Sequence, residues 1–157
     1  MAELSQAEAR GIDMGPLRSS LGFLLRLGQL TSFEDFYTGL ADLGLRPGEF
    51  SVMIILYRNP GIRQGVLAQR LMIKRAHMTK MIRTMEDAGL VERAIPEDDR
   101  RSVELRLTGE GQNLVARHLP RWRAHEARPK ETLSAAEEAD LLRLLRKYLD
   151  LPEDGAK

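Results

Sequence analysis

The stretch that decides the fold is QGVLAQRLMIKRAHMTKMIRTMEDA, residues 64–88. Its apolar residues follow two helical patterns, one over about 64–72 and one over about 75–88. In the second pattern, Met78, Met81, Ile82 and Met85 fall at i, i+3, i+4 and i+7, which is typical of a helix with one buried stripe. About three residues around Ile73 separate the two helices, so the stretch predicts a helix-turn-helix.

The period of the apolar residues then changes from 3.6 to 2, which predicts two strands after the second helix. Val91, Arg93 and Ile95 alternate with Glu92 and Ala94, and Val103, Leu105 and Leu107 form the second run. The polar segment 96–102 between them is a turn cluster. A β-hairpin directly after a helix-turn-helix makes a winged helix-turn-helix, in which the second helix is the recognition helix.

The net charge hides a strongly uneven distribution. The chain has 157 residues, 24 basic and 23 acidic, for a net charge of +1. That total alone says nothing in favour of nucleic acid as a partner. However, residues 50–85 carry seven basic residues and no acidic one. Such a segment favours a surface that faces DNA phosphates, although chance and a solvated face remain the alternative.

The outward face of the predicted recognition helix carries the residue types that major-groove binding requires. Opposite the methionine stripe lie Ala76, Lys80 and Arg83, with His77 and Thr79 on the flanks. We expect Lys80 and Arg83 to contact bases or phosphates and one arginine of the hairpin loop to enter the minor groove. The candidate DNA-binding residues are Arg63, Gln64, Lys74, Arg75, Ala76, His77, Thr79, Lys80, Arg83, Asp99, Arg100 and Arg101.

Helical patterns flank this region on both sides. A long helix is expected over about 17–43, with Pro16 in its first turn, and a second helix opens at Pro47 and stops at Asn59. After the hairpin, Thr108 caps a helix to about residue 119, where Pro120 kinks or ends it. A capping box at Ser134–Glu137 starts the last helix, about 135–149. Residues 1–15 and 150–157 are expected to be flexible tails.

From about 45 to 111 the chain resembles the MarR (multiple antibiotic resistance regulator) family of bacterial transcription factors. The matching motifs are Leu67-Ala-Gln-Arg-Leu71, Thr79-Lys80, Met85 to Arg93 and Asp99 to Gly111. The resemblance implies a homodimer, a pseudo-palindromic operator and an effector pocket, often for aromatic or phenolic compounds or their thioesters. It divides a single unit, 16–150, into a DNA-binding lobe, 45–107, and a dimerisation region, 16–44 plus 108–150.

The sequence departs from the family at three helix N-caps and one recognition position. Where Ser, Thr or Asp is common, this chain has Arg46, Arg63 and Lys74. A cation there loses the cap bond, worth about 1 kcal/mol, and opposes the helix dipole. We expect Arg63 and Lys74 to lower the stability of their helices in this way and to make phosphate contacts in the complex with DNA. His77 replaces a common Thr, so the operator is expected to differ from familiar ones.

The effector site is the least determined feature. The aromatic and methionine residues Phe33, Phe36, Tyr37, Phe50 and Met53 line a pocket in one interpretation and are simply core in the other. Arg26 either binds an effector carboxylate or phosphate or forms a salt bridge in the dimer.

Other classes of function are disfavoured. The chain has no cysteine, no motif that pairs a serine with His and an acid, and no ligand cluster around His118 and His125. We therefore expect no enzyme activity, cofactor or metal. Without a membrane span or signal peptide, it is expected to be cytoplasmic, and nucleoid-associated when bound to DNA. The prediction is a mainly α fold with a β-hairpin wing and a ligand-responsive repressor; the alternative is an effector-independent architectural or protein-interacting DNA binder.

Overall fold

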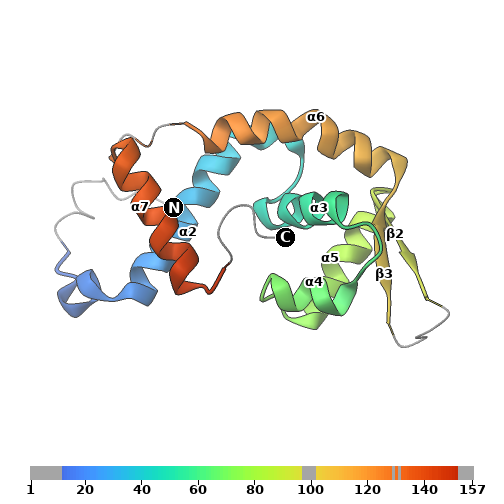
Figure 1. The fold of residues 1–157 in the computed structure, drawn as a ribbon, viewed down its shortest axis with the longest axis horizontal. Coiled ribbons are helices and arrows are strands. Elements are labelled where there is room, and N and C mark those ends of the chain that lie inside the picture. The colour runs from blue at the N-terminus through green and yellow to red at the C-terminus, as the bar shows by residue number, and fades with distance from the viewer. Residues whose placement is uncertain (1–11, 97–101, 129, 131, 152–157) are drawn as a thin grey trace. The chain divides into compact units, whose positions relative to one another are not determined.

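A computed structural model describes residues 12–96, 102–128, 130 and 132–151. The chain divides into two compact units, Met1–Val115 and Ala116–Lys157. The first holds most of the helices and a small antiparallel sheet. The described residues form the mainly helical winged fold that the sequence predicted (Figure 1).

The helix expected over 17–43 is interrupted near both ends. The segment consists of a 3-10 helix η1 (Gly15–Ser19), helix α2 (Leu21–Leu40) and a 3-10 helix η2 (Ala41–Leu43). Ser20 is extended and caps α2, because its hydroxyl accepts a hydrogen bond from the Phe23 backbone N–H at 3.4 Å. The prediction of one continuous helix was therefore wrong: Ser20 is a better N-cap than a helix interior residue.

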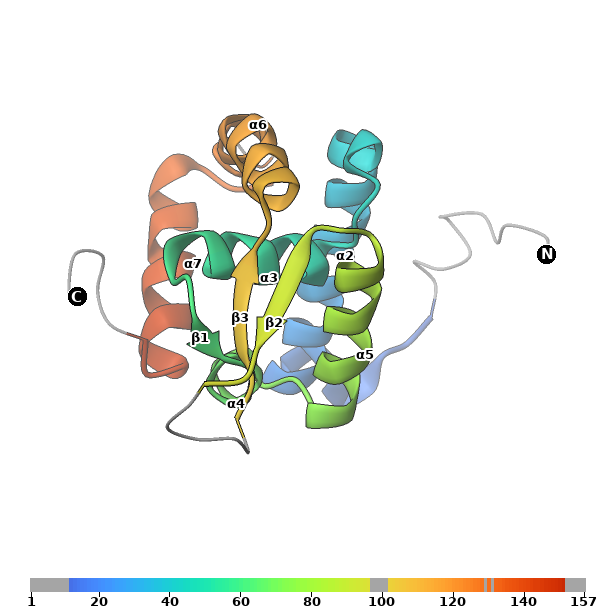
Figure 2. The same ribbon diagram turned by 90° about the vertical axis from the view of Figure 1, so that its right-hand side faces the viewer.

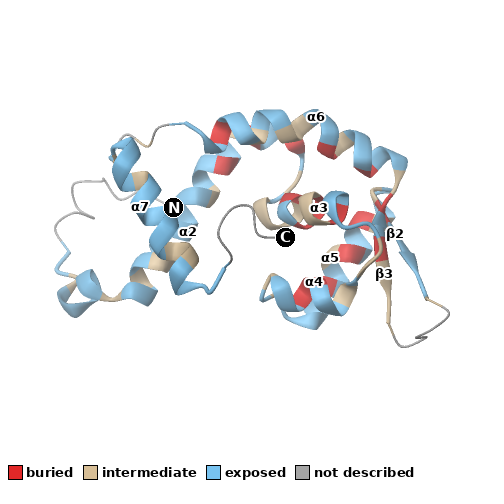
Figure 3. Cartoon of the chain, viewed as in Figure 1, coloured by how far each residue is buried: buried red, intermediate tan, exposed pale blue. Residues whose placement is uncertain are grey.

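The predicted helices of the DNA-binding lobe are present with boundaries shifted by one or two residues. They are α3 (Pro47–Arg58), α4 (Gln64–Arg70) and α5 (Arg75–Asp87). Their inward residues form the core, shown in red in Figure 3. The fully or nearly fully buried side chains of these three helices are Phe50, Val52, Met53, Leu56, Leu67, Ala68, Met78, Ile82 and Met85.

The wing sheet has one strand more than the sequence predicted. The hairpin strands β2 (Val91–Ala94) and β3 (Glu104–Leu107) pair antiparallel, with Val91 opposite Leu107. A two-residue strand β1 (Ile62–Arg63) pairs with the other edge of β3, giving the order β1-β3-β2 (Figure 2). Two residues are too few to show a period of 2, so β1 left no pattern in the sequence. The pairing of β1 with β3 connects the start of α4 to the wing sheet.

The last two helices are α6 (Gly109–Glu126) and α7 (Ala135–Tyr148). Helix α6 continues through Pro120, so the alternative in which Pro120 ends the helix was wrong. The capping box of α7 is confirmed: the Ser134 hydroxyl accepts from the Glu137 N–H, and the Glu137 carboxylate accepts from the Ser134 N–H at 2.8 Å. The Ser134 hydroxyl and backbone hydrogen bonds lower the pKa of Glu137.

A close backbone contact fixes the beginning of α6. The Thr108 hydroxyl accepts from the Gly111 N–H at 3.1 Å, as its predicted capping role requires, and donates to the Gly89 carbonyl at 2.6 Å. The Thr108 N–H donates to the Leu90 carbonyl at 3.1 Å. A Cβ atom at Gly111 would lie 2.1 Å from the Leu90 carbonyl oxygen, closer than any real contact. Only glycine fits there without moving the backbone.

We expect Gly111→Ala to lower the free energy of unfolding by about 3 kcal/mol, because the new methyl group must displace the backbone at Leu90. Gly109, two residues earlier, is the matched control, since a Cβ there meets nothing within 4 Å. Gly109→Ala should leave stability unchanged or raise it by up to about 1 kcal/mol. Chemical denaturation measures both; equal effects would contradict the close contact.

Candidate nucleic-acid interface

Helix α5 has one fully buried face and one exposed polar face. Met78, Ile82 and Met85 are at most 2% exposed. The residues predicted to face DNA from this helix all lie on its exposed side: Ala76, His77, Thr79, Lys80 and Arg83. The sequence-based division of the helix therefore places these five side chains where a partner can reach them.

The beginnings of α4 and α5 carry further exposed cations. Arg63 is the N-cap of α4 and Lys74 the N-cap of α5, and neither side chain makes a capping hydrogen bond. Arg75 follows at the first position of α5 and is exposed. The first N–H groups of α5 thus receive no side-chain cap, and the positive end of the helix dipole lies beside two cations. Such an end attracts an anion.

The N-cap of α3 differs from these two. Arg46 also lacks a side-chain oxygen, but its backbone N–H donates to the Glu49 carboxylate at 2.9 Å. Half of a capping box is therefore retained at α3, where the sequence had predicted only the loss of the cap.

At the acidic C-terminal end of α5, Glu86 contacts the wing. Glu86 forms an ion pair with Arg93 of β2, and this hydrogen bond raises the pKa of the Arg93 guanidinium. Both side chains are partly exposed, so the pair contributes little to stability. Its effect is local: the Glu86 charge is compensated.

Two predicted DNA-binding residues contact each other. The side-chain amide of Gln64, the first residue of α4, donates to the Thr79 hydroxyl of α5 at 3.0 Å. Thr79 in turn donates to the Arg75 backbone carbonyl at 2.9 Å. The sequence contained no signal for this pair, because its members lie fifteen residues apart. Asp99, Arg100 and Arg101, the predicted wing-tip residues, lie outside the described residues, as do most of the predicted tails.

The predicted effector residues do not lie together on one accessible surface. Phe36, Phe50 and Met53 are buried in the core of the first unit, which favours the core interpretation for these three. Phe33 is half-buried, whereas Arg26 and Tyr37 are exposed. The Tyr37 ring stands edge-on to Phe36, with ring centroids 6.0 Å apart.

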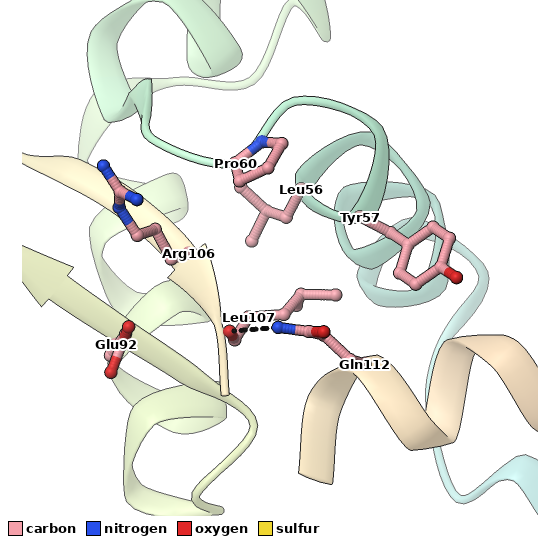
Figure 4. Close-up of a pocket in the computed structure, with 7 residues that line it drawn as sticks. All are labelled: Leu56, Tyr57, Pro60, Glu92, Arg106, Leu107 and Gln112. Atoms are coloured by element: carbon pink, nitrogen blue, oxygen red, sulfur yellow. Dashed lines mark hydrogen bonds between the residues drawn. The ribbon is translucent and has the colours of Figure 1, made fainter. Parts of the chain in front are cut away.

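A pocket of about 530 Å³ opens elsewhere in the first unit, beside the wing (Figure 4). Two of its polar side chains have partners: the Arg106 guanidinium lies 3.5 Å from the Glu104 carboxylate, and the Gln112 amide donates to the Leu107 carbonyl at 3.4 Å. Its lining residues are Leu56, Tyr57, Pro60, Glu92, Arg106, Leu107 and Gln112.

Within residues 12–96, 102–128, 130 and 132–151, His, Asp and Glu side chains form no group of three that would hold a metal ion. In the same part of the chain, none of the helices combines the length and apolarity needed to cross a membrane.

Comparisons with known proteins agree with this architecture. Residues 45–103 match the MarR family. The chain is 30% identical over 134 residues to a regulatory protein named for the hcr operon of Thauera aromatica, covering 85% of this chain and 81% of that protein. It is 33% identical over 128 residues to an HTH-type transcriptional repressor of Mycobacterium tuberculosis, covering 81% and 91%.

Among solved structures, the transcriptional repressor CouR bound to a 23-mer DNA duplex is 36% identical, with a TM-score of 0.78 and coverage of 88% of this chain and 98% of CouR. CouR bound to p-coumaroyl-CoA is similar at 33% identity and the same TM-score. These relatives are transcriptional regulators, and they extend over most of the sequence, beyond the winged helix-turn-helix itself. The chain belongs to the MarR family of winged helix-turn-helix transcriptional regulators.

Proposed function

We propose that the chain is a homodimeric repressor that binds a pseudo-palindromic DNA operator and leaves it when a small aromatic acid or its aryl thioester binds. One observation carries the DNA part of this proposal: the exposed face of α5 presents Lys80 and Arg83 in a 36-residue segment, 50–85, without any acidic residue. An amphipathic helix that only covers a core normally mixes glutamate with lysine on its solvent face.

The geometry supports distinct roles for the cations. Lys80 and Arg83 lie on the exposed face of the recognition helix, where major-groove contacts are made. Arg63, Lys74 and Arg75 lie at helix beginnings, where phosphate contacts set the register of a protein on DNA. In a dimer, two copies of α5 would enter successive major grooves about 34 Å apart.

Exposed leucines support the homodimer. Helix α2 leaves Leu21, Leu24, Leu27 and Leu30 between 38% and 51% exposed. Helix α7, in the second unit, exposes Leu141, Leu142, Leu144 and Tyr148 by 46% to 60%. Apolar exposure on this scale is typical of an interface. We assign the dimerisation region to 16–44 plus 108–150 and the DNA-binding lobe to 45–107, in a cytoplasmic protein.

The effector class rests on similarity to CouR, which has been solved with p-coumaroyl-CoA. In this chain, Arg26 and Tyr37 of α2 are the exposed candidates for contacts with an anionic aromatic ligand. Such an effector would act by binding more tightly to a dimer whose recognition helices do not match the operator spacing, which shifts the population off DNA.

We expect the protein to enrich one duplex from a randomised DNA pool and to bind it in a salt-dependent manner. Fluorescence anisotropy with that duplex should then show release by p-coumaroyl-CoA or by p-coumarate, with free coenzyme A as the control. Absence of any enriched duplex would contradict the DNA-binding proposal. Enrichment without release by any aromatic acid or thioester would instead favour an effector-independent DNA binder.

We expect Lys74→Ser to raise the melting temperature, because serine restores an N-cap bond worth about 1 kcal/mol and removes a cation from the positive end of α5. The same change should also weaken the salt dependence of DNA binding. The slope of log binding constant against log salt concentration should become less steep by about 0.9 for each phosphate contact that is lost.

Arg46→Ser is the matched control for this prediction. It places the same cap on α3, outside the proposed DNA surface, so it should affect stability without changing the salt slope. If the salt dependence of DNA binding stays unchanged in Lys74→Ser, Lys74 makes no phosphate contact.

A further inference from the structure

Gln64 joins three elements of the DNA-binding lobe. Its backbone belongs to the first turn of α4, and its N–H donates to the carbonyl of Val103, just before β3, at 2.8 Å. Its side-chain amide donates to the Thr79 hydroxyl of the recognition helix α5 at 3.0 Å. A single residue thus connects the loop end of the wing strand β3, the first helix of the helix-turn-helix and the recognition helix.

The single hydrogen of the Thr79 hydroxyl determines which residue is the donor in the bond between Gln64 and Thr79. A threonine hydroxyl has one hydrogen to donate, and Thr79 donates it to the Arg75 carbonyl at 2.9 Å within its own helix. Toward Gln64 the Thr79 oxygen can therefore only accept. The glutamine must present its Nε2–H₂ group to Thr79, and the alternative amide orientation, with Oε1 toward Thr79, would place two acceptors against each other.

Thr79 therefore has no hydrogen left to donate to DNA. Its one proton and one of its acceptor sites are used inside the protein, although the side chain lies on the exposed side of α5. The other candidates on that side, His77, Lys80 and Arg83, are the ones whose ring or cationic groups can donate to base edges or phosphates.

We propose that Gln64 and Thr79 form a positioning pair, which sets α5 relative to α4 and the wing, and that Thr79 recognises no base. The proposal rests on the DNA-binding function proposed above and amends the direct DNA contact predicted for Thr79. Groups that recognise a ligand must be held to within a fraction of an ångström, and hydrogen bonds from neighbouring elements provide that constraint. Among the residues of α5, sequence discrimination then depends on Ala76, His77, Lys80 and Arg83.

The test uses the full chain and a duplex that the wild-type protein selects from a randomised pool. Thr79→Val and Gln64→Met each remove the bond while keeping side-chain size. Each should weaken binding by about five- to tenfold, the effect of one lost hydrogen bond, and the double variant should lose no more than either single variant. Thr79→Ser keeps the hydroxyl and should restore wild-type affinity.

Thr84→Val is the matched control. Thr84 lies on the same helix and makes the same kind of bond to a carbonyl four residues earlier, that of Lys80, at 3.1 Å. It faces no partner like Gln64 among the bonds that the described residues make, so its replacement should leave affinity within twofold.

The decisive measurement is the base-preference profile, obtained with a panel of all single base-pair changes in the selected duplex. The profiles of Thr79→Val and Gln64→Met should run parallel to that of the wild type, with every affinity lowered by the same factor. A loss of discrimination at one base pair in Thr79→Val alone, or additive losses in the double variant, would overturn the proposal while leaving DNA binding itself intact. Failure to select any duplex would overturn the proposed function and the positioning role together.

Discussion

The complete burial of one stripe of α5 is the constraint on which the rest of the DNA-binding lobe depends. Met78, Ile82 and Met85 fill the space against the neighbouring core residues, and burying each contributes about 1.5–3 kcal/mol. Because the helix has a fixed period, this burial also determines the direction of every other side chain on it. The same three residues that stabilise the fold therefore turn Lys80 and Arg83 toward solvent.

Around that helix, backbone contacts set the position of the wing. Strand β1 pairs with β3, the Gln64 N–H donates to the Val103 carbonyl, and the Thr108 N–H donates to the Leu90 carbonyl. None of these contacts requires a large apolar side chain. They connect the beginnings of α4 and α6 to the wing through N–H and C=O groups that every sequence has, which explains why residue type alone did not reveal them.

Periodicity predicted the helices that carry a long apolar stripe and the hairpin that alternates, and the structure confirms both. It also predicted which side chains of α5 are exposed, since that follows from the stripe. It missed the break at Ser20, where a local capping bond outweighs a helical pattern on both sides, and the two-residue strand β1. The bond between Gln64 and Thr79 depends on the packing of two helices, and no local pattern encodes it. The aromatic residues of 33–53 were ambiguous, because a core and a pocket require the same residue types at the same spacing.

The passage of α6 through Pro120 has a mechanical consequence. Proline has no N–H, so the carbonyl four residues earlier, that of Ala116, receives no helical hydrogen bond from it. The turn of α6 that contains Pro120 therefore has one helical bond fewer than its neighbours, and bending the helix costs less energy at this turn than in the turns beside it.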